Sequence, residues 1–208
     1  MVRTFTRRAA IGVGAGAAVL PLVSRAQDAP LGYAFRGPAA DIGVTLRPTA
    51  SCGVQTAAQT DGPFYTPQTP GRADLAEPGG PGTPFVLQGL VLTSDCRPVA
   101  GAVLDFWHCD EAGVYDNEGF RYRGHQFTDA AGAYRLETIR PGKYPARTEH
   151  IHVKMQGPET RRLTTQLYFP DRLEENFLDR IFRNDLLIAL QRTVDGWNAR
   201  FDFVLTPA

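Results

Sequence analysis

Short apolar stretches that alternate with turn residues are the feature that most restricts how this 208-residue chain can fold. The stretches recur at intervals of about 8–15 residues and are separated by Gly, Pro and Asp, a pattern typical of antiparallel sheets. The sequence therefore predicts an all-β protein, an antiparallel β-sandwich with long loops. We expect strands at residues 85–92, 102–107, 124–128, 133–138, 149–155, 163–169 and 200–205.

One segment near the C-terminus predicts a helix instead of a strand. Within residues 174–183, the apolar side chains Phe177, Leu178 and Ile181 would lie on one side of a helix. We therefore expect one short helical segment in the C-terminal part of the sandwich.

Three segments of different composition divide the chain. Residues 1–26 carry the pair Arg7 and Arg8 before an apolar run, and they resemble a twin-arginine export signal. The run is too short and too rich in Gly and Ala for a membrane span, so we expect export to the periplasm or the medium without stable membrane insertion. An uncleaved membrane anchor is the alternative. Residues 27–58, rich in Gly, Pro and Ala, predict an extended arm, and residues 59–208 predict a single domain.

Charge and cysteine content limit the partners and the crosslinks. The 22 basic and 22 acidic residues give no reason to expect nucleic acid or an anionic surface as a partner. In an exported chain, three cysteines permit one disulfide. A straight strand over residues 102–107 would hold Cys96 and Cys109 about 30 Å apart, whereas a disulfide needs about 4.4–6.8 Å between Cα atoms. Cys52 is therefore the expected partner of either Cys96 or Cys109.

Two histidines on one predicted strand are the first sign of a metal site. Because strand residues rise about 3.3 Å each and alternate between faces, His150 and His152 would project from the same face, about 6–7 Å apart at the backbone. Tyr115 and Tyr144 each follow a glycine turn. Two neutral imidazoles and two phenolates are a ligand set suited to a hard trivalent ion, whose charge the phenolates would largely offset.

Six short motifs lie between residue 60 and the C-terminus. In order they are T-D-G-P-F-Y, W-H-C-D-E-A-G-V-Y, T-D-A-A-G-A-Y, I-R-P-G-K-Y-P, R-T-E-H-I-H and T-T-Q-L-Y-F. Together they resemble the intradiol ring-cleaving dioxygenases, the family of protocatechuate 3,4-dioxygenase and catechol 1,2-dioxygenase. Members of that family are non-haem Fe(III) enzymes that use O2 to open a catechol ring between its two hydroxyls.

The resemblance implies an iron site made of four side chains. Tyr115, Tyr144, His150 and His152 match the family's ligands, and Tyr115 is the tyrosine expected to stay bound through turnover. Tyr144 is expected to leave the ion when the catechol arrives. Its freed phenolate would accept a proton from the incoming hydroxyl, because the phenols of tyrosine and catechol have comparable pKa values near 10.

Two further residues match active-site positions of the family. Arg147 matches an arginine that stabilises negative charge on the substrate, and Gln166 matches a glutamine that hydrogen-bonds near the iron. The family has R-P-A-H where this chain has R-T-E-H, so Glu149 adds a carboxylate beside a ligand. Strand alternation predicts that Glu149 turns to the face opposite His150; on the same side it would pair with Arg147 and weaken that role. The T-D-G-P-F-Y segment is expected to wall the substrate pocket.

The resemblance implies that the domain cleaves a catechol-type diol with O2 to a cis,cis-muconate-type dicarboxylic acid. A non-catalytic secreted β-sandwich module, of the carboxypeptidase-regulatory-like or adhesion type, is the alternative; it explains the glycine-tyrosine turns but not the two histidines together with Tyr115. Two phenolates disfavour copper or zinc. His108 and His125 match no ligand and are interpreted as ordinary polar residues, with His108 a candidate for lining the site. The particular catechol, self-association into a homo-oligomer and completion of the pocket by a second subunit are left open.

Overall fold

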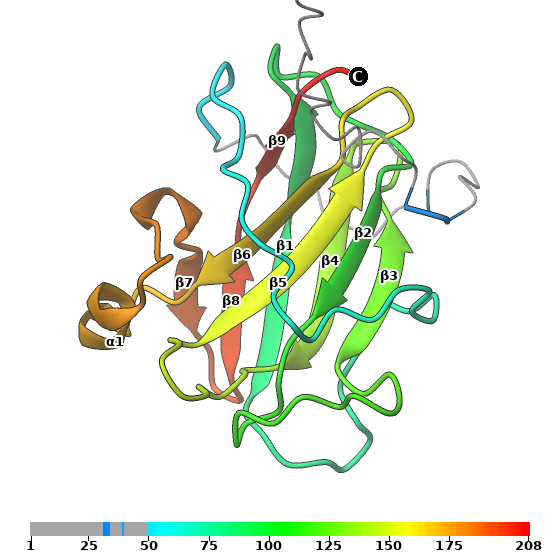
Figure 1. The fold of residues 1–208 in the computed structure, drawn as a ribbon. Coiled ribbons are helices and arrows are strands. Elements are labelled where there is room, and N and C mark those ends of the chain that lie inside the picture. Colours follow the sequence, from blue (N-terminus) through cyan, green and yellow to red (C-terminus); the bar gives the residue numbers. More distant parts are fainter. Residues whose placement is uncertain (1–30, 34–38, 40–49) are drawn as a thin grey trace, which may run out of the picture.

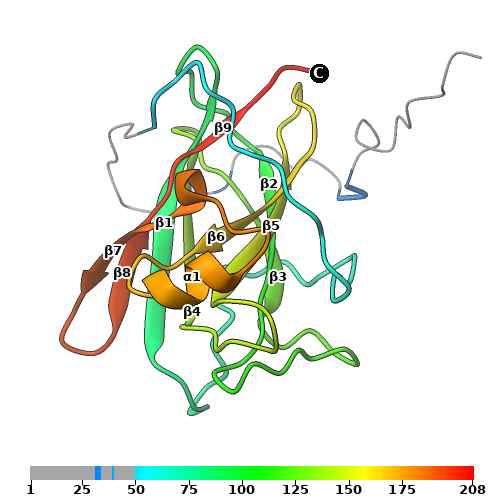
Figure 2. The same ribbon diagram turned by 60° about the vertical axis from the view of Figure 1, so that its left-hand side comes forward.

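The computed structural model describes residues 31–33, 39 and 50–208 and contains two sheets packed face to face (Figures 1 and 2). One sheet has the strand order β4-β1-β8-β7, with β9 also pairing with β1, and the other has the order β3-β2-β5-β6. The predicted β-sandwich is confirmed. The elements are β1 Pro84–Thr93, β2 Val103–Trp107, β3 Arg123–Phe127, β4 Ala133–Ile139, β5 His150–Gln156, β6 Leu163–Tyr168, α1 Leu173–Leu178, the 3-10 helix η2 Asn184–Leu186, β7 Ala189–Arg192, β8 Trp197–Arg200 and β9 Phe203–Leu205.

The C-terminal end of the chain pairs with β1 differently from the prediction. β1 pairs with β4 in an antiparallel sense but with β8 and β9 in a parallel sense. Gly89 in β1 permits a close approach there, because a Cβ on it would lie 1.8 Å from the carbonyl oxygen of Phe201. Asp202 interrupts the ladder by accepting a hydrogen bond from the Leu90 N–H at 3.0 Å. The strand predicted for residues 200–205 is therefore shorter, β9, and β8 before it overlaps the predicted range only at Arg200.

The hydrophobic core lies between the sheets and takes the residues on one face of each strand. In β5, Ile151 and Val153 point into this core and are fully buried. The alternate residues of β5, including His150 and His152, are buried as well. They are covered by residues 56–69, which cross the outer face of this sheet in front of β5 in Figure 1. The candidate ligands therefore lie under a covering segment and not on a free sheet surface.

The helix α1 is shorter than predicted and packs through a polar residue. It ends at Leu178 rather than near Arg183. Phe177 and Leu178 are 77% and 81% exposed, whereas Asn176 is buried. The side-chain oxygen of Asn176 accepts a hydrogen bond from the Thr148 hydroxyl at 2.8 Å. The apolar side predicted for this helix thus faces outward, and a polar contact fastens the helix to the loop before β5.

A disulfide joins Cys52 to Cys96, with their Cα atoms 5.4 Å apart. Of the two pairings left open by the sequence, this is the one that forms, and Cys109 is a buried free thiol. The bridge fastens the segment before the covering residues to the turn between β1 and β2.

The predicted export signal, residues 1–26, lies outside the described residues, and so does most of the predicted arm, residues 27–58. Of the described arm residues, Tyr33 donates a hydrogen bond from its hydroxyl to the buried Asp105 at 2.7 Å. Within the ranges that the structure describes, no helix has the length and apolar character needed to cross a bilayer.

Candidate metal centre

Two buried histidines of β5 lie side by side on the outer face of their sheet. Their side chains share this face because strand residues two apart point the same way. The Nε2 atoms of His150 and His152 are 3.1 Å apart. Two nitrogens that bind one metal ion at about 2.1 Å and at a right angle lie about 3 Å from each other. The spacing of the pair therefore fits a shared ion.

Both imidazoles are neutral, which is the form that binds a metal. Burial lowers the pKa of His150 to about 3, and the nearby Arg147 acts in the same direction. Burial, followed by the neighbouring His150, lowers the pKa of His152 well below its usual value. The Nδ1 of His150 donates to the carbonyl oxygen of Thr148 at 2.6 Å, because a carbonyl can only accept. Its Nε2 therefore carries the lone pair, which faces His152 Nε2 and would turn to an ion bound between the two rings.

Trp107 orients the second imidazole. The strand register places Trp107 opposite His152, and the two rings stack with centroids 4.7 Å apart and planes 10° from parallel. The Nδ1 of His152 is buried and has no hydrogen-bond partner in the described part of the chain. Ring stacking therefore holds His152, where a backbone hydrogen bond holds His150.

The two predicted tyrosine ligands come from two loops that touch through glycine residues. A Cβ on Gly113 would lie 2.2 Å from a carbonyl oxygen of the other loop, and one on Gly142 would lie 2.3 Å from a carbonyl oxygen of the first. Gly113 also has a φ of 83°, which disfavours any residue with a side chain. The glycines of the G-x-Y motifs thus allow the two backbones to meet, and this contact brings Tyr115 and Tyr144 together.

The tyrosine rings lie against the imidazoles. The ring centroids of Tyr115 and His152 are 6.3 Å apart. Those of Tyr144 and His150 are 5.6 Å apart, and the two tyrosine centroids are also 5.6 Å apart. Phe64 stacks on Tyr115 at 4.4 Å and meets Tyr144 edge-on at 5.8 Å. All four predicted ligands therefore lie in one cluster, which we call the Tyr-His cluster.

The hydroxyl groups of the two tyrosines have different surroundings. The hydroxyl of Tyr115 is buried and has no hydrogen-bond partner in the described part of the chain; burial, followed by the neighbouring Cys109, raises its pKa. Tyr144 is half-buried, and its oxygen accepts a hydrogen bond from Arg147 Nη1 at 3.1 Å. Burial raises the pKa of Tyr144, and Arg147 opposes this shift.

The Tyr-His cluster fits the ferric ion that the resemblance implies. It offers two neutral imidazoles and two phenols, and the orphaned buried hydroxyl of Tyr115 would gain a partner by binding an ion. Phenolate and imidazole are oxygen and nitrogen donors suited to a hard or borderline ion. Among the described residues, no group of three or more His, Cys, Asp or Glu is placed to hold a metal, so the set relies on its tyrosines.

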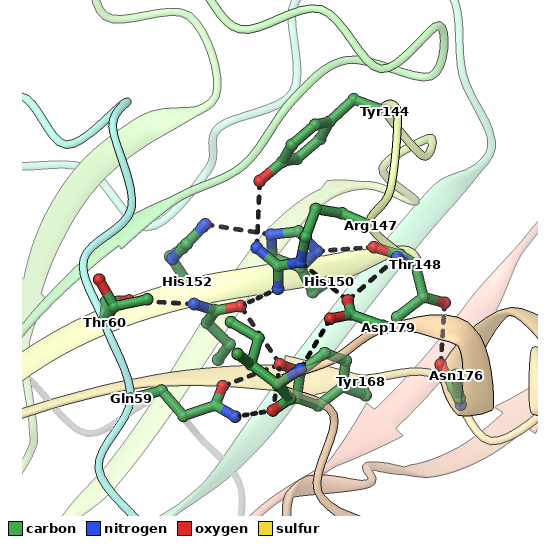
Figure 3. Close-up of polar contacts among 12 residues, drawn as sticks. Gln59, Thr60, Tyr144, Arg147, Thr148, His150, His152, Tyr168, Asn176 and Asp179 are labelled. Carbon is green, nitrogen blue, oxygen red and sulfur yellow. Dashed lines mark hydrogen bonds and ion pairs between the residues drawn. The ribbon is translucent and has the colours of Figure 1, made fainter.

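Arg147 lies between three acceptors (Figure 3). Its Nη1 donates to the Tyr144 oxygen at 3.1 Å, its Nη2 donates to Gln166 Oε1, and its Nε donates to Asp179 Oδ2 at 2.8 Å. Gln166 pairs with His152 across β5 and β6, so it lies on the same face. The structure thus brings both predicted active-site residues to the edge of the Tyr-His cluster.

Glu149 turns away from the cluster, as strand alternation predicts. Its two carboxylate oxygens accept hydrogen bonds from Arg140 Nε and Arg172 Nε, both at 2.8 Å. Arg140 also donates to both oxygens of Asp171, at 2.9 and 2.7 Å. Glu149 therefore leaves Arg147 free to face the cluster, and this ion-pair network fastens the start of α1 to the ends of β4 and β5.

Two residues of α1 and its C-terminal end contact the site and were not predicted from the sequence. Asp179 accepts hydrogen bonds from Arg147 and from the Thr148 N–H, and Asn176 accepts one from the Thr148 hydroxyl. Neither lies in a motif, and about 30 residues separate them from the loop that they contact. Only the packing of α1 against that loop reveals them.

The T-D-G-P-F-Y segment lies over the cluster. Asp61 pairs with Lys154 at 2.6 Å, and the Lys154 ammonium sits 3.6 Å from the centre of the Tyr65 ring. A Cβ on Gly62 would already lie 3.4 Å from His152. A pocket of about 310 Å³ opens beside Tyr144 and α1.

The two remaining histidines lie outside the cluster. The ring nitrogens of His108 contact the Cys109 carbonyl and the Thr138 hydroxyl, both at 2.7 Å. Both ring nitrogens of His108 are therefore engaged by groups other than the four candidate ligands. The Nδ1 of His125 donates to the Thr69 carbonyl at 2.8 Å.

Comparisons with known proteins identify relatives of the whole sandwich. The sequence profile of a family described as "Dioxygenase" matches residues 60–207. The chain is 28% identical over 193 residues to hydroxyquinol 1,2-dioxygenase of Corynebacterium glutamicum, and 32% identical over 177 residues to 6-chlorohydroxyquinol 1,2-dioxygenase of Cupriavidus pinatubonensis. These matches cover 73% and 70% of this chain but 64% and 63% of the relatives, so the chain spans less than two thirds of their length.

Solved structures give the same result. The dioxygenase domain of a dioxygenase and carbohydrate-binding protein fusion from Streptomyces sp. SirexAA-E is 45% identical with a TM-score of 0.72; the match covers 74% of this chain and all of that one. Hydroxyquinol 1,2-dioxygenase from Pseudomonas putida DLL-E4, at 24% identity and a TM-score of 0.66, shares the fold over 74% of this chain and 67% of its own. Because the family profile covers most of the chain and contains all six motifs, this chain belongs to the intradiol ring-cleaving dioxygenase family.

Proposed function

We propose that this chain is a non-haem Fe(III) dioxygenase that uses O2 to cleave a catechol-type diol to a cis,cis-muconate-type dicarboxylic acid. The observation that carries the proposal is the Tyr-His cluster. It combines two neutral imidazoles whose Nε2 atoms are 3.1 Å apart with a buried tyrosine hydroxyl that lacks a partner. Membership of the family supplies the class of reaction.

The four ligands would hold the ion with different firmness. His150, His152 and Tyr115 are buried. His152 stacks on Trp107, Tyr115 stacks on Phe64, and His150 donates to the Thr148 carbonyl, so these three side chains would stay in place. When bound, the ferric ion would draw electron density from a coordinated diol and make its ring reactive toward O2. Tyr144 would also hold the ion, but it is half-buried and lines the pocket of about 310 Å³. We assign to it the role of accepting a proton from the diol, because the two phenols have similar pKa values near 10.

Arg147 and Gln166 would act on the substrate. A guanidinium stays charged at any working pH, and two of its nitrogens already face the Tyr144 oxygen and Gln166. Arg147 would stabilise negative charge on a substrate bound beside Tyr144. Gln166 donates from its Nε2 to the Thr60 carbonyl at 3.0 Å, so its side-chain oxygen faces Arg147.

The names of the relatives and the size of the pocket support the proposed substrate class. Curated relatives are named as dioxygenases of catechol, chlorocatechol, hydroxyquinol and protocatechuate. The pocket of about 310 Å³ beside Tyr144 is lined by Pro145, Ala146 and Leu178 together with Arg147. We propose a single-ring catechol as the substrate, with its ring substituents directed toward this pocket.

Iron loading and oxygen uptake test the proposal. Protein purified with added iron should contain about one ion per chain, show the red colour of phenolate-to-Fe(III) charge transfer, and consume O2 with one or more of the catechols named above. His152→Ala should lose the colour and the activity. His125→Ala is the matched control, because His125 lies on the same sheet outside the cluster. A colourless, iron-free wild-type protein after supplementation would refute the proposal and favour the non-catalytic module.

A further inference from the structure

We infer that Asp179 is a positioning residue for this reaction: its buried carboxylate directs the guanidinium of Arg147 toward Tyr144 and Gln166. The inference rests on the proposed function, since it assigns a role within the same site. It concerns a residue that belongs to no motif and follows the end of α1 (Figure 3).

The carboxylate of Asp179 is itself firmly held. Its side chain is 1% exposed. Oδ2 accepts hydrogen bonds from Arg147 Nε at 2.8 Å and from the Thr148 N–H at 3.2 Å, and Oδ1 accepts one from the Ile181 N–H at 3.1 Å. A buried charge is costly unless it is paired and hydrogen-bonded. Because backbone donors on both sides satisfy this carboxylate, it forms a fixed anchor for the side chain of Arg147.

Because a guanidinium is rigid and planar, the bond to Asp179 also fixes the orientation of the whole Arg147 head group. Its five N–H donors lie in one rigid plane, so a bond from Nε fixes the direction of both Nη atoms. In this structure they reach the Tyr144 oxygen and Gln166 Oε1. Tyr144 and Gln166 are neutral acceptors, and Asp179 is the charged one. Without Asp179, the half-buried Arg147 could turn its charged head toward solvent.

The same helix also supports a histidine through a separate contact. The Thr148 hydroxyl donates to Asn176 at 2.8 Å, and the Thr148 carbonyl accepts the hydrogen bond from His150 Nδ1. Loss of Asp179 removes one bond to the Thr148 backbone but leaves the Asn176 contact in place. The iron content of an Asp179 variant therefore separates the two effects. It should fall only if the position of the candidate ligand His150 is disturbed, and it should stay normal if only Arg147 is affected.

Steady-state kinetics of the iron-loaded full chain test the inference. Asp179→Ala should keep its iron and lower kcat by about tenfold or more, and by no more than Arg147→Ala, since removal of one charge-stabilising donor costs about 10²–10³ in kcat. Asp179→Asn should recover part of the loss, because its amide oxygen can still accept from Arg147. The double variant Arg147→Ala/Asp179→Ala should match Arg147→Ala alone, because Asp179 acts only through Arg147. Glu174→Ala, which removes an exposed carboxylate of α1, is the control and should keep the wild-type kcat and iron content.

A second measurement needs neither iron nor turnover. In the ¹⁵N spectrum of the metal-free protein, the Arg147 Nε–H signal, identified by its loss in Arg147→Lys, should be protected from solvent exchange. Protection should disappear in Asp179→Ala and persist in Glu174→Ala. An unchanged kcat in Asp179→Ala, additive losses in the double variant, or an exposed Arg147 Nε–H in the wild type would each overturn the inference. A wild type that binds no iron would refute the proposed function, and the exchange measurement would still decide whether Asp179 holds Arg147.

Discussion

Replacing Tyr115 by Phe should have opposite effects on the metal-free and the iron-loaded protein. In the metal-free protein the ring keeps its stack on Phe64 and loses only a hydroxyl. That hydroxyl is buried and has no hydrogen-bond partner in the part of the chain that the structure describes, so its removal relieves a desolvation cost of about 1–3 kcal/mol. We expect the metal-free Tyr115→Phe protein to be about 1–2 kcal/mol more stable, which raises the melting temperature by about 2–8 °C for a domain of this size.

The sign should reverse when iron is present. An ion that binds the folded chain stabilises it according to its affinity, and each tenfold loss of affinity removes about 1.4 kcal/mol of that stabilisation. Tyr115→Phe removes one of four ligands, so the increase in melting temperature on adding iron should shrink or vanish. The phenolate-to-Fe(III) absorption should weaken in parallel, and ring cleavage should be lost. Thermal unfolding with and without iron, followed beside the absorption spectrum, measures all of these effects.

Tyr134→Phe is the matched control. Tyr134 is also buried, but its hydroxyl donates to the Phe201 carbonyl at 2.8 Å. Loss of a satisfied bond should destabilise the protein by about 1 kcal/mol, with or without iron. If metal-free Tyr115→Phe is instead destabilised as much as Tyr134→Phe, the Tyr115 hydroxyl has a partner, and the argument that it awaits an ion is wrong.

Three further predictions concern stability and loop packing. Burial lowers the pKa of His108 to about 4, below its unfolded value of about 6.5. The free energy of unfolding should therefore fall as the pH drops from about 6.5 toward 4, by up to about 1.4 kcal/mol per pH unit for this group. In His108→Gln, the free energy of unfolding measured with urea should depend less steeply on pH over that range. Cys96→Ser opens a disulfide to Cys52 that spans 44 residues and should cost about 4 kcal/mol in denaturant unfolding, whereas Cys109→Ser should not reproduce that loss. In Gly113→Ala the new Cβ would lie 2.2 Å from a carbonyl oxygen of the Tyr144 loop, at a φ of 83°. The variant should lose more than about 1–2 kcal/mol of unfolding free energy and should bind less iron. A normal iron content would contradict the idea that contact between the two loops positions the tyrosines.

Alternation of apolar residues predicted strands well where one face of the strand enters the core. The strand expected at residues 133–138 is β4, Ala133–Ile139. β7, Ala189–Arg192, was missed because it is an edge strand whose side chains are mostly exposed, so no buried face imposes a pattern. The predicted helix was misjudged for a related reason. Phe177 suggested a buried side, but in the structure the buried contacts of α1 are made by Asn176.

The residues of the site fall into two groups that differ in how far a sequence can reveal them. The two histidines could be placed from strand geometry, and the positions of Tyr115, Arg147 and Gln166 followed from family motifs. The supporting residues could not be predicted, because their contacts join distant parts of the chain. Asp179 reaches Arg147 only because an ion-pair network and Asn176 fix a six-residue helix beside β5. No local period or spacing encodes that contact.

Burial of the polar face of β5 explains why the site and its cover must form together. His150, His152 and Lys154 are 2%, 1% and 6% exposed, and buried polar groups destabilise a fold unless they find partners. Lys154 finds Asp61, which belongs to the covering segment. The two imidazoles face each other and two phenols, an arrangement that the proposed ion would complete. Since the cover begins a few residues after Cys52, the disulfide fastens the segment that keeps water from the cluster. The disulfide, the covering segment and the candidate ligands therefore act as one unit, and opening the disulfide should weaken iron binding by the Tyr-His cluster.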